Sequence, residues 1–142
     1  MTFKDRVSFQ ERLNESIRIR DKFPGRIPII VERSLRSLNM PVIDKEKFLV
    51  PGDLNISQFI FVIRKRMVLS SEQALFLFIG GALPTTAMLI RELYSSFCDP
   101  DGFMYASYCG ENTFGQAISD GDGDGGGAGA GAGEREGLSI TD

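Results

Sequence analysis

The sequence predicts an α+β domain with a mixed four-stranded sheet, preceded by a helical extension and followed by a tail outside the domain. Short β-branched or aromatic runs alternate with segments of helical period up to residue 115, a length that suits one small core. Residues 116–142, by contrast, hold nine of the 16 glycines and only scattered apolar side chains. Such a segment cannot bury enough surface to offset its ordering entropy. We therefore expect one domain over residues 1–115 and a disordered glycine-rich segment over residues 116–142.

The first expected element is an amphipathic helix over residues 9–22. Residues at helical spacing along one face are Phe9, Leu13, Ile17 and Arg20, and charged residues occupy the other faces. A proline and a glycine follow and end the helix.

Two strands are expected next. Residues 26–33 form a β-branched run, in which Pro28 indicates an edge position or the beginning of a strand. Residues 45–50 form a second run, closed by Pro51 and Gly52. A helix is then predicted from residue 56 to about residue 67.

The start of this main helix has a local signature. Asn55 is a good cap, and Gln58 stands three residues later, as a capping box requires. Basic residues 64–66 fall in the last turn, where cations complement the helix dipole. The expected buried stripe consists of Phe59, Ile60, Val62 and Ile63.

The remaining elements are a strand over residues 74–79, a turn at Gly80 and Gly81, a helix over residues 86–97 and a strand over residues 103–108. The order is therefore two strands, a helix, a strand, a helix and a strand. One mixed sheet with the main helix packed across it fits this order, as in a β-grasp fold.

Composition argues against several classes of function. The two cysteines form no CxxC pair, and the chain has no histidine, so we expect no metal site and no cofactor. The missing histidine also removes the usual base for a Ser or Cys nucleophile, so the chain is not expected to be an enzyme. The net charge is −3 and no nucleic-acid-binding signature occurs, so a nucleic-acid partner is not expected.

The charge is divided unevenly along the chain. Residues 1–115 carry 15 basic and 13 acidic groups, whereas residues 116–142 carry one basic and six acidic groups. No apolar run approaches the roughly 20 residues that span a bilayer, and the N-terminus does not resemble a signal peptide. We therefore expect a cytoplasmic protein that meets membranes through an added lipid, a partner or an amphipathic surface.

Several short motifs together carry a resemblance. In chain order they are Arg26-Ile27-Pro28, Ile43-Asp44-Lys45, Phe48-Leu49-Val50-Pro51, Asp53-Leu54, Gln58-Phe59, Val62-Ile63-Arg64-Lys65-Arg66, Asp101-Gly102-Phe103 and Gly110-Glu111-Asn112-Thr113-Phe114-Gly115. With them, residues 1–115 closely resemble the autophagy-related ubiquitin-like modifier family, which includes GABARAP. The resemblance implies a ubiquitin-like β-grasp with a two-helix N-terminal extension over about residues 1–24.

The resemblance also implies a precursor that a cysteine protease trims after Gly115. Activating and conjugating enzymes would then join the new carboxylate to phosphatidylethanolamine. The residues suit this chemistry, because a glycine without Cβ enters a narrow site and Phe114 offers an apolar anchor. The alternative is that Gly115 is only a turn glycine before a linker. The rival pair Gly80 and Gly81 lies before residues that the domain still needs, and we expect a turn there.

The family also binds extended peptides at a sheet edge, with an aromatic residue and an aliphatic residue three positions later entering two pockets. By motif position, the first pocket draws on Glu15, Ile19, Pro28, Lys47, Leu49 and Phe103. The second draws on Phe48, Val50, Pro51, Leu54, Phe59, Val62 and Arg66. Beside the pockets, Lys45, Lys47 and Arg66 would attract acidic residues that flank such ligands. The alternative is that Val50, Phe59 and Val62 are ordinary core residues, and that the basic triplet Arg64-Lys65-Arg66 is only a solvated helix end.

A third surface is expected on the strand at residues 74–79, where Phe76 and Phe78 point to the same face. The resemblance implies that this face contacts the processing and conjugation enzymes, and the alternative is burial under the N-terminal extension. Basic residues of the extension suggest contact with acidic tubulin or anionic lipid; they include Arg6, Arg12, Arg18 and Arg20.

The leading hypothesis is a cytoplasmic precursor of a lipid-conjugated modifier, found on autophagosome and vesicle membranes once lipidated, that recruits cargo receptors through aromatic-x-x-aliphatic motifs. The second hypothesis is an unconjugated adaptor with the same pockets, acting in vesicle trafficking or microtubule attachment. A catalytic protein that uses Cys98 or Cys109 is the third.

Overall fold

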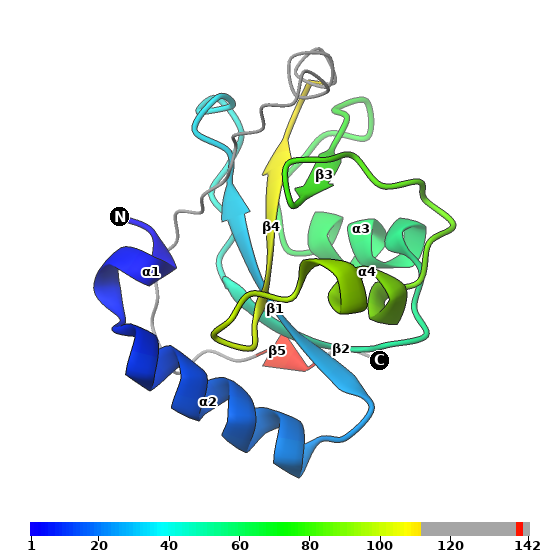
Figure 1. Ribbon diagram of the computed structural model, residues 1–142. Coiled ribbons are helices and arrows are strands. Elements are labelled where there is room, and N and C mark those ends of the chain that lie inside the picture. The colour runs from blue at the N-terminus through cyan, green and yellow to red at the C-terminus, as the bar shows by residue number, and fades with distance from the viewer. Residues whose placement is uncertain (112–138, 141–142) are drawn as a thin grey trace.

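A computed structural model describes residues 1–111 and 139–140 of the chain (Figure 1). Its helices are α1 (Phe3–Arg6), α2 (Phe9–Lys22), α3 (Ile56–Arg64) and α4 (Ile90–Phe97). Its strands are β1 (Arg26–Arg33), β2 (Lys47–Pro51), β3 (Phe76–Ile79), β4 (Met104–Cys109) and β5 (Ser139–Ile140).

The strands form one sheet in the order β3-β4-β1-β2-β5. Strand β1 runs antiparallel to β2 and parallel to β4, and β3 runs antiparallel to β4. Helices α1 and α2 lie on one side of this sheet, and α3 and α4 lie on the other (Figure 1). The predicted α+β class, with a mixed four-stranded sheet and two N-terminal helices, is confirmed for β1 to β4.

Strand β5 lies in the segment for which composition predicted disorder. It pairs in parallel with β2, with Phe48 opposite Ser139 and Leu49 opposite Ile140. The expected disorder of residues 116–142 stays a prediction, and the edge of β2 offers residues 139–140 main-chain partners that composition does not reveal. Residues 116–138 and 141–142 lie outside the described residues.

Pro28 lies in a central strand, yet its missing N–H is tolerated. Strand β1 pairs with β2 from Arg26 onwards, but its pairing with β4 begins only at Ile29. Pro28 therefore lies near the beginning of the strand, where β1 has β2 as its neighbour. Of the two positions that the sequence suggested, the beginning of a strand is correct.

Three helices begin with a capping box. Thr2 and Asp5 form one before α1, Ser8 and Glu11 form one before α2, and Asn55 and Gln58 form the predicted one before α3. In the last, the Gln58 N–H donates to Asn55 Oδ1 at 2.8 Å, and the Asn55 N–H donates to Gln58 Oε1 at 2.9 Å. These reciprocal bonds satisfy backbone donors that a helix start leaves without partners.

Some boundaries differ from the predictions. Helix α3 ends at Arg64, and α4 begins at Ile90, four residues later than expected. The segment before α4 is not helical, because its main-chain carbonyls accept hydrogen bonds from the first residues of α3. The Ile56 N–H donates to the Met88 carbonyl at 3.0 Å, and the Ser57 N–H donates to the Thr86 carbonyl at 3.1 Å. The second, third and fourth expected strands are shifted or shortened by one or two residues.

The glycine pair after β3 forms a tight turn, as predicted. Gly80 and Gly81 have φ angles of 63° and 80°, in the left-handed region that favours glycine. Ile79 and Ala82 exchange two main-chain hydrogen bonds of 2.9 and 3.1 Å across the turn.

The buried face of α2 differs from the predicted one. Phe9 and Ile17 are 45% and 44% exposed. The residues that are buried are Arg12, Ser16 and Ile19. Two of these are polar, and both are held by Asp101: Arg12 Nε donates to its carboxylate at 2.8 Å, and the Ser16 hydroxyl donates to its carbonyl. Hydrogen-bond partners in a turn that is distant in sequence therefore decide which face of α2 is buried, and the spacing of its apolar residues does not.

The sheet separates two apolar clusters. The larger one lies between the sheet and helices α3 and α4, and includes Phe48, Val50, Phe59, Leu77 and Tyr108. The smaller one lies under α1 and α2 and consists of Phe3, Ile19, Ile30, Leu49 and Phe103. Neighbouring residues of β2 contribute to opposite clusters, as the alternation of side chains along a strand requires.

Candidate functional site

Strand β2 is the structural centre of the predicted peptide site. On one side it pairs with β1, and on the other it pairs with the short β5. Phe48 and Val50 face the larger cluster, whereas Leu49 faces the smaller one. An extended segment that took the place of β5 would therefore find a row of main-chain groups with apolar side chains above and below it.

The structure brings the residues of the predicted first pocket together. Ile19, Leu49 and Phe103 are buried within one cluster, and Pro28 stands opposite Leu49 in the β1–β2 register. A T-shaped contact between Phe3 and Phe103, with ring centroids 5.7 Å apart, closes the cluster towards α1. The sequence did not assign Phe3 to this pocket, although its place in the Thr2–Asp5 capping box indicated an ordered N-terminus.

The polar members of the first pocket form an ion pair. Lys47 Nζ lies 2.8 Å from Glu15 Oε2, and the Lys47 side chain is only 1% exposed. The same ammonium lies 5.5 Å from the centre of the Phe3 ring. A buried charge needs such partners, because its desolvation would otherwise oppose folding.

The residues of the predicted second pocket lie on the opposite face of β2. Phe48, Val50 and Phe59 are fully buried, with Phe48 and Phe59 in a T-shaped contact at 5.7 Å. Leu54 and Val62 are partly buried against them. Of the residues that the core interpretation named, Val50 and Phe59 are buried and Val62 is only partly buried. A binding role for the second-pocket residues stays a prediction. Two further residues of the predicted second pocket are more exposed. Pro51 ends β2 and is partly exposed. Arg66 is also partly exposed, and its Nη1 lies 3.7 Å from Asp44 Oδ2.

Asp101 connects α2 to the sheet. Besides Arg12 and Ser16, it accepts the Tyr105 hydroxyl at 2.6 Å and the Phe103 N–H at 2.8 Å. Burial, together with this hydrogen bond, raises the pKa of Tyr105, which keeps its hydroxyl a donor. The turn at Asp101 thereby holds the helix that carries Glu15 and Ile19 and the strand that follows Phe103. In the sequence, Asp101 stands out only within the motif Asp101-Gly102-Phe103, which does not reveal that Asp101 joins α2 to the sheet.

Glu32 is a second buried acid that sequence reasoning missed. Its side chain is 3% exposed, and its Oε2 accepts the Phe3 N–H at 3.0 Å. Its Oε1 has no hydrogen-bond partner among residues 1–111 and 139–140. Burial raises the pKa of Glu32 to about 7, against the opposing effect of the Phe3 N–H. Protonation of this carboxyl is therefore coupled to the position of α1.

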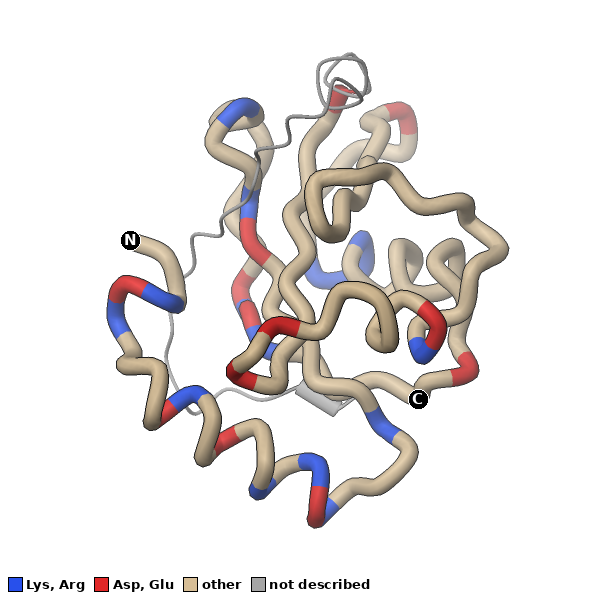
Figure 2. The backbone as a smooth tube through the Cα atoms, in the orientation of Figure 1, with Lys and Arg blue, Asp and Glu red and all other residues tan. Residues whose placement is uncertain are grey.

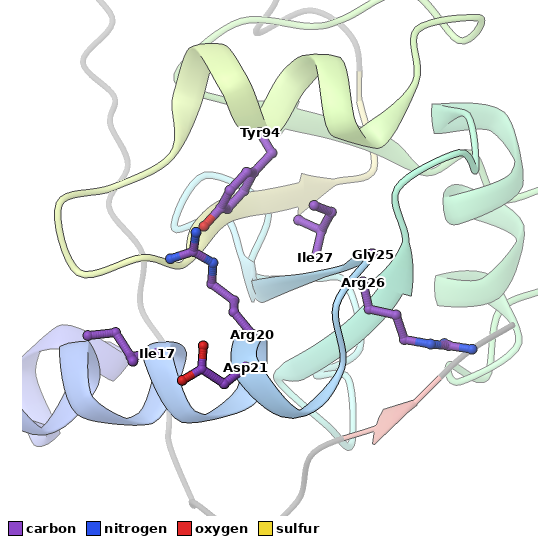
Figure 3. A pocket seen from close by; sticks show the side chains of 7 residues that line it. All are labelled: Ile17, Arg20, Asp21, Gly25, Arg26, Ile27 and Tyr94. Atoms are coloured by element: carbon purple, nitrogen blue, oxygen red, sulfur yellow. The ribbon is translucent and has the colours of Figure 1, made fainter.

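A cleft lies apart from both predicted pockets. It has a volume of about 360 Å³ and is lined by Ile17, Arg20, Asp21, Gly25, Arg26, Ile27 and Tyr94. Figure 3 shows the Arg20 side chain extending from α2 towards Tyr94 of α4, and the guanidinium carbon lies 5.8 Å from the centre of that ring. No lining residue belongs to the two predicted peptide pockets. No local pattern in the sequence indicates this cleft, because its walls come from three separate elements: α2, β1 and α4.

Charges along the N-terminal extension are mixed in sign (Figure 2). Arg6 Nη2 lies 3.2 Å from Glu46, and Arg12 is paired with Asp101, so these two arginines are engaged within the domain. Arg18 and Arg20 are exposed. Contact of this region with tubulin or anionic lipid stays a prediction.

Phe76 and Phe78 lie on the face of β3 that points away from the larger cluster, because Leu75, Leu77 and Ile79 enter that cluster. Phe78 is 5% exposed and Phe76 is partly buried. Neither belongs to the cluster under α1 and α2. The enzyme-contact role of the two phenylalanines stays a prediction.

The two cysteines differ in environment. Cys98 is exposed, whereas Cys109 is buried at the end of β4. Burial raises the pKa of the Cys109 thiol, which lowers its thiolate fraction and its reactivity.

The predicted cleavage and lipidation positions, Phe114 and Gly115, lie outside the described residues. Within the described ranges, none of the helices has the length and apolar character needed to cross a bilayer.

Comparisons with known proteins agree with this architecture. A family model described as "Autophagy protein Atg8 ubiquitin like" matches residues 11–115. Autophagy-related protein 8 of Mycosarcoma maydis is 52% identical over 114 residues, which are 80% of this chain and 96% of the relative. Autophagy-related protein 8 of Saccharomyces cerevisiae is 50% identical over 115 residues, covering 81% and 97%. Autophagy-related protein 8c of Arabidopsis thaliana is 51% identical over 114 residues, covering 80% and 95%.

Proposed function

The chain belongs to the Atg8 family of ubiquitin-like autophagy proteins, and on this premise we propose that it is the precursor of a lipid-conjugated modifier. A cysteine protease trims it after Gly115, and activating and conjugating enzymes join the new carboxylate to phosphatidylethanolamine. The conjugate then acts on autophagosome and vesicle membranes and recruits cargo receptors. The chain supplies the substrate carboxylate, and the reactive cysteines belong to its enzymes.

The observation that supports the processing position is where the family match ends. The match stops at residue 115, and the relatives cover about four-fifths of this chain while nearly all of their own length is covered. The 27 residues that follow are thus an addition to the family domain. Strand β4 ends at Cys109, six positions before Gly115 in the sequence.

The proposed chemistry is acyl transfer. An activating enzyme first joins the Gly115 carboxylate to the adenylyl group of ATP, and pyrophosphate leaves. An enzyme cysteine thiolate then attacks the acyl-adenylate carbonyl, so the C–S bond of a thioester forms and AMP leaves. The amine of phosphatidylethanolamine attacks the thioester carbonyl, so an amide C–N bond forms, the C–S bond breaks, and the thiolate leaves as the amine loses a proton. A glycine suits this step because it has no Cβ to obstruct the approach of the amine.

Intact mass spectrometry of an N-terminally tagged chain from starved cells tests this proposal. The native chain should yield a species that ends at Gly115 and a fraction heavier by one phosphatidylethanolamine. Both should be absent in Gly115→Ala and present in the matched control Gly121→Ala, which alters a tail glycine. If only the 142-residue chain appears in every sample, conjugation is excluded and the adaptor hypothesis replaces it.

We further propose that cargo receptors bind by adding an extended aromatic-x-x-aliphatic segment to β2. The supporting geometry is the strand itself, with one predicted pocket on each face. Lys45 and Arg66 are partly exposed and would attract acidic residues that flank such a segment.

Charge reversal at two neighbouring residues tests whether the peptide binds at the basic residues beside β2 or responds to any charge near the end of α3. Arg66→Glu should weaken the binding of an acidic-flanked peptide by roughly tenfold, measured by fluorescence anisotropy. Lys65→Glu is the matched control, because the neighbouring ammonium lies over the exposed Phe61 ring, 5.0 Å from its centre. Equal weakening by both variants would indicate a general charge effect and contradict the assigned surface.

A further inference from the structure

The outer edge of β2 is occupied by the chain itself. Strand β5 runs parallel to β2, with Phe48 opposite Ser139 and Leu49 opposite Ile140. The other side of β2 is paired with β1 over five residues. Both sides of β2 therefore have a strand neighbour in the 142-residue chain, and the edge proposed above for cargo peptides is the edge that β5 occupies.

From this juxtaposition we propose that residues 139–140 act as an internal ligand that blocks the peptide-binding edge until the tail is removed. This inference rests on the proposed function of β2 as a peptide site. One row of main-chain N–H and C=O groups can pair with only one added strand at a time. The tail and a cargo peptide therefore compete for the same groups.

The sequence around β5 fits the surroundings of β2. Leu138, Ser139 and Ile140 alternate apolar and polar residues, and acidic Glu136 and Asp142 flank them. The segment of residues 116–142 has a net charge of −5, whereas residues 1–115 have a net charge of +2. An acidic segment with apolar side chains is the same chemical class of ligand that the basic residues beside β2 are proposed to attract.

The position of the proposed cut explains how the block would be released. Gly115 lies between β4 and β5, so the cut separates β5 from the domain. Water adds across the amide of Gly115 and Gln116, which gives the new carboxylate and a free amine on Gln116. Before the cut, the tether holds β5 near β2 at a high effective concentration; afterwards β5 belongs to a separate peptide that two strand residues hold only weakly. The same cut would thus create the conjugation terminus and open the peptide site.

The test compares three full-length chains. In Ser139→Pro/Ile140→Pro, proline removes both main-chain N–H groups from β5. In the matched control, Ala130→Pro/Gly131→Pro, the same residues enter the tail outside β5. Each chain is titrated into a fluorescein-labelled aromatic-x-x-aliphatic peptide, and the Kd is read by anisotropy. Amide hydrogen exchange at residues 47–50 is followed in the same chains without peptide.

We expect the β5 variant to bind the peptide about tenfold more tightly than the native chain, as when the edge is free in one molecule in ten of the native protein. Its β2 amides should exchange faster, and the control should match the native chain in both measurements. Equal Kd values together with equal exchange rates in all three chains would overturn the proposal. A difference that grows with protein concentration would also overturn it, because β5 would then reach a second molecule.

The two measurements separate this proposal from the one on which it rests. If no chain binds the peptide but the β5 variant exchanges faster at residues 47–50, the edge pairing is supported and β2 is not a cargo site. If the β5 variant and the native chain both bind the peptide with the same Kd, and their amides at residues 47–50 exchange at the same rate, the cargo site is supported and the internal block is excluded.

Discussion

The two faces of the sheet are covered by different chemistry. Helices α3 and α4 cover one face through a continuous apolar cluster that includes Phe48, Phe59 and Leu77. Helices α1 and α2 cover the other face through a small apolar cluster together with buried polar groups, among them Asp101 and Glu32. The apolar contacts under α3 and α4 are non-directional, and their stabilisation scales with the buried area. The contacts under α1 and α2 depend on individual hydrogen-bond and ion-pair partners and on charge.

This difference indicates how the two faces respond to change. Apolar burial on the α3 face is insensitive to pH and salt, so that side should behave as the stable part of the domain. The α2 face combines fewer apolar residues with titratable groups, so its helices should open locally at lower free energy. The proposed first pocket lies on that adjustable face, and the second lies on the stable one.

The largest expected effect comes from breaking the α3 face. Phe59→Ala removes a fully buried ring that contacts Phe48, and should lower the free energy of unfolding by about 3–5 kcal/mol. Phe61→Ala is the matched control on the same helix: Phe61 is 61% exposed, so the change should stay within about 0.5 kcal/mol. Urea denaturation measures both. Similar losses in the two variants would contradict the assigned core.

The next effect comes from the anchor of α2. Asp101→Asn removes the charge opposite the buried Arg12 and should lower the free energy of unfolding by about 3 kcal/mol. Asp44→Asn removes an exposed carboxylate that lies 3.7 Å from Arg66, and should cost less than about 0.5 kcal/mol. Denaturation curves at low and high salt check the comparison. A salt-sensitive loss in Asp101→Asn would mean that the pair is not shielded from solvent.

A pH series sharpens the comparison through Glu32. Its pKa is about 7 in the native state, against 4.5 as its ordinary value. Between these two pH values the native state holds a proton that the unfolded state has released. The contribution of Glu32 to the free energy of unfolding is therefore fully present below about pH 4.5 and is lost as the pH rises through about 7.

Relative to Glu32→Gln, the native chain should therefore lose about 2–3 kcal/mol of unfolding free energy between pH 4.5 and 7.5. Urea denaturation across that range measures the difference, and groups common to both chains cancel. Glu72→Gln, at an exposed position, should track the native chain. Parallel curves for the native chain and Glu32→Gln would show that Glu32 is not protonated near neutral pH.

The smallest effect concerns the ion pair of the first pocket. Glu15→Gln keeps an oxygen that can accept from the Lys47 ammonium, and the carboxylate that it removes is 17% exposed, unlike that of Asp101, so the free energy of unfolding should fall by only about 1 kcal/mol. It should also raise the exchange rate of α2 amides more than that of α3 amides, since the pair joins α2 to β2. Uniform acceleration across both helices would show that the two faces open as one unit.

Much of the fold could be predicted because its signals are local. Asn55 and Gln58 marked the start of α3, and the glycine pair after β3 marked a turn, since both features depend on residues that are neighbours in sequence. Alternation along a strand is a property of the backbone, so the neighbouring residues Phe48, Leu49 and Val50 of β2 enter opposite clusters, while their binding roles stay a prediction.

The sequence by itself thus determined the order of elements, the cap of α3, the glycine turn and the family. Only the tertiary structure decided that α2 buries Arg12 and Ser16, that α4 starts at Ile90, that Glu32 loses its contact with water, and that Ser139 and Ile140 lie beside β2. Each of these depends on partners far away in the chain. Their free energy comes from desolvation and hydrogen bonds that exist only after the segments have met, so no local pattern records them.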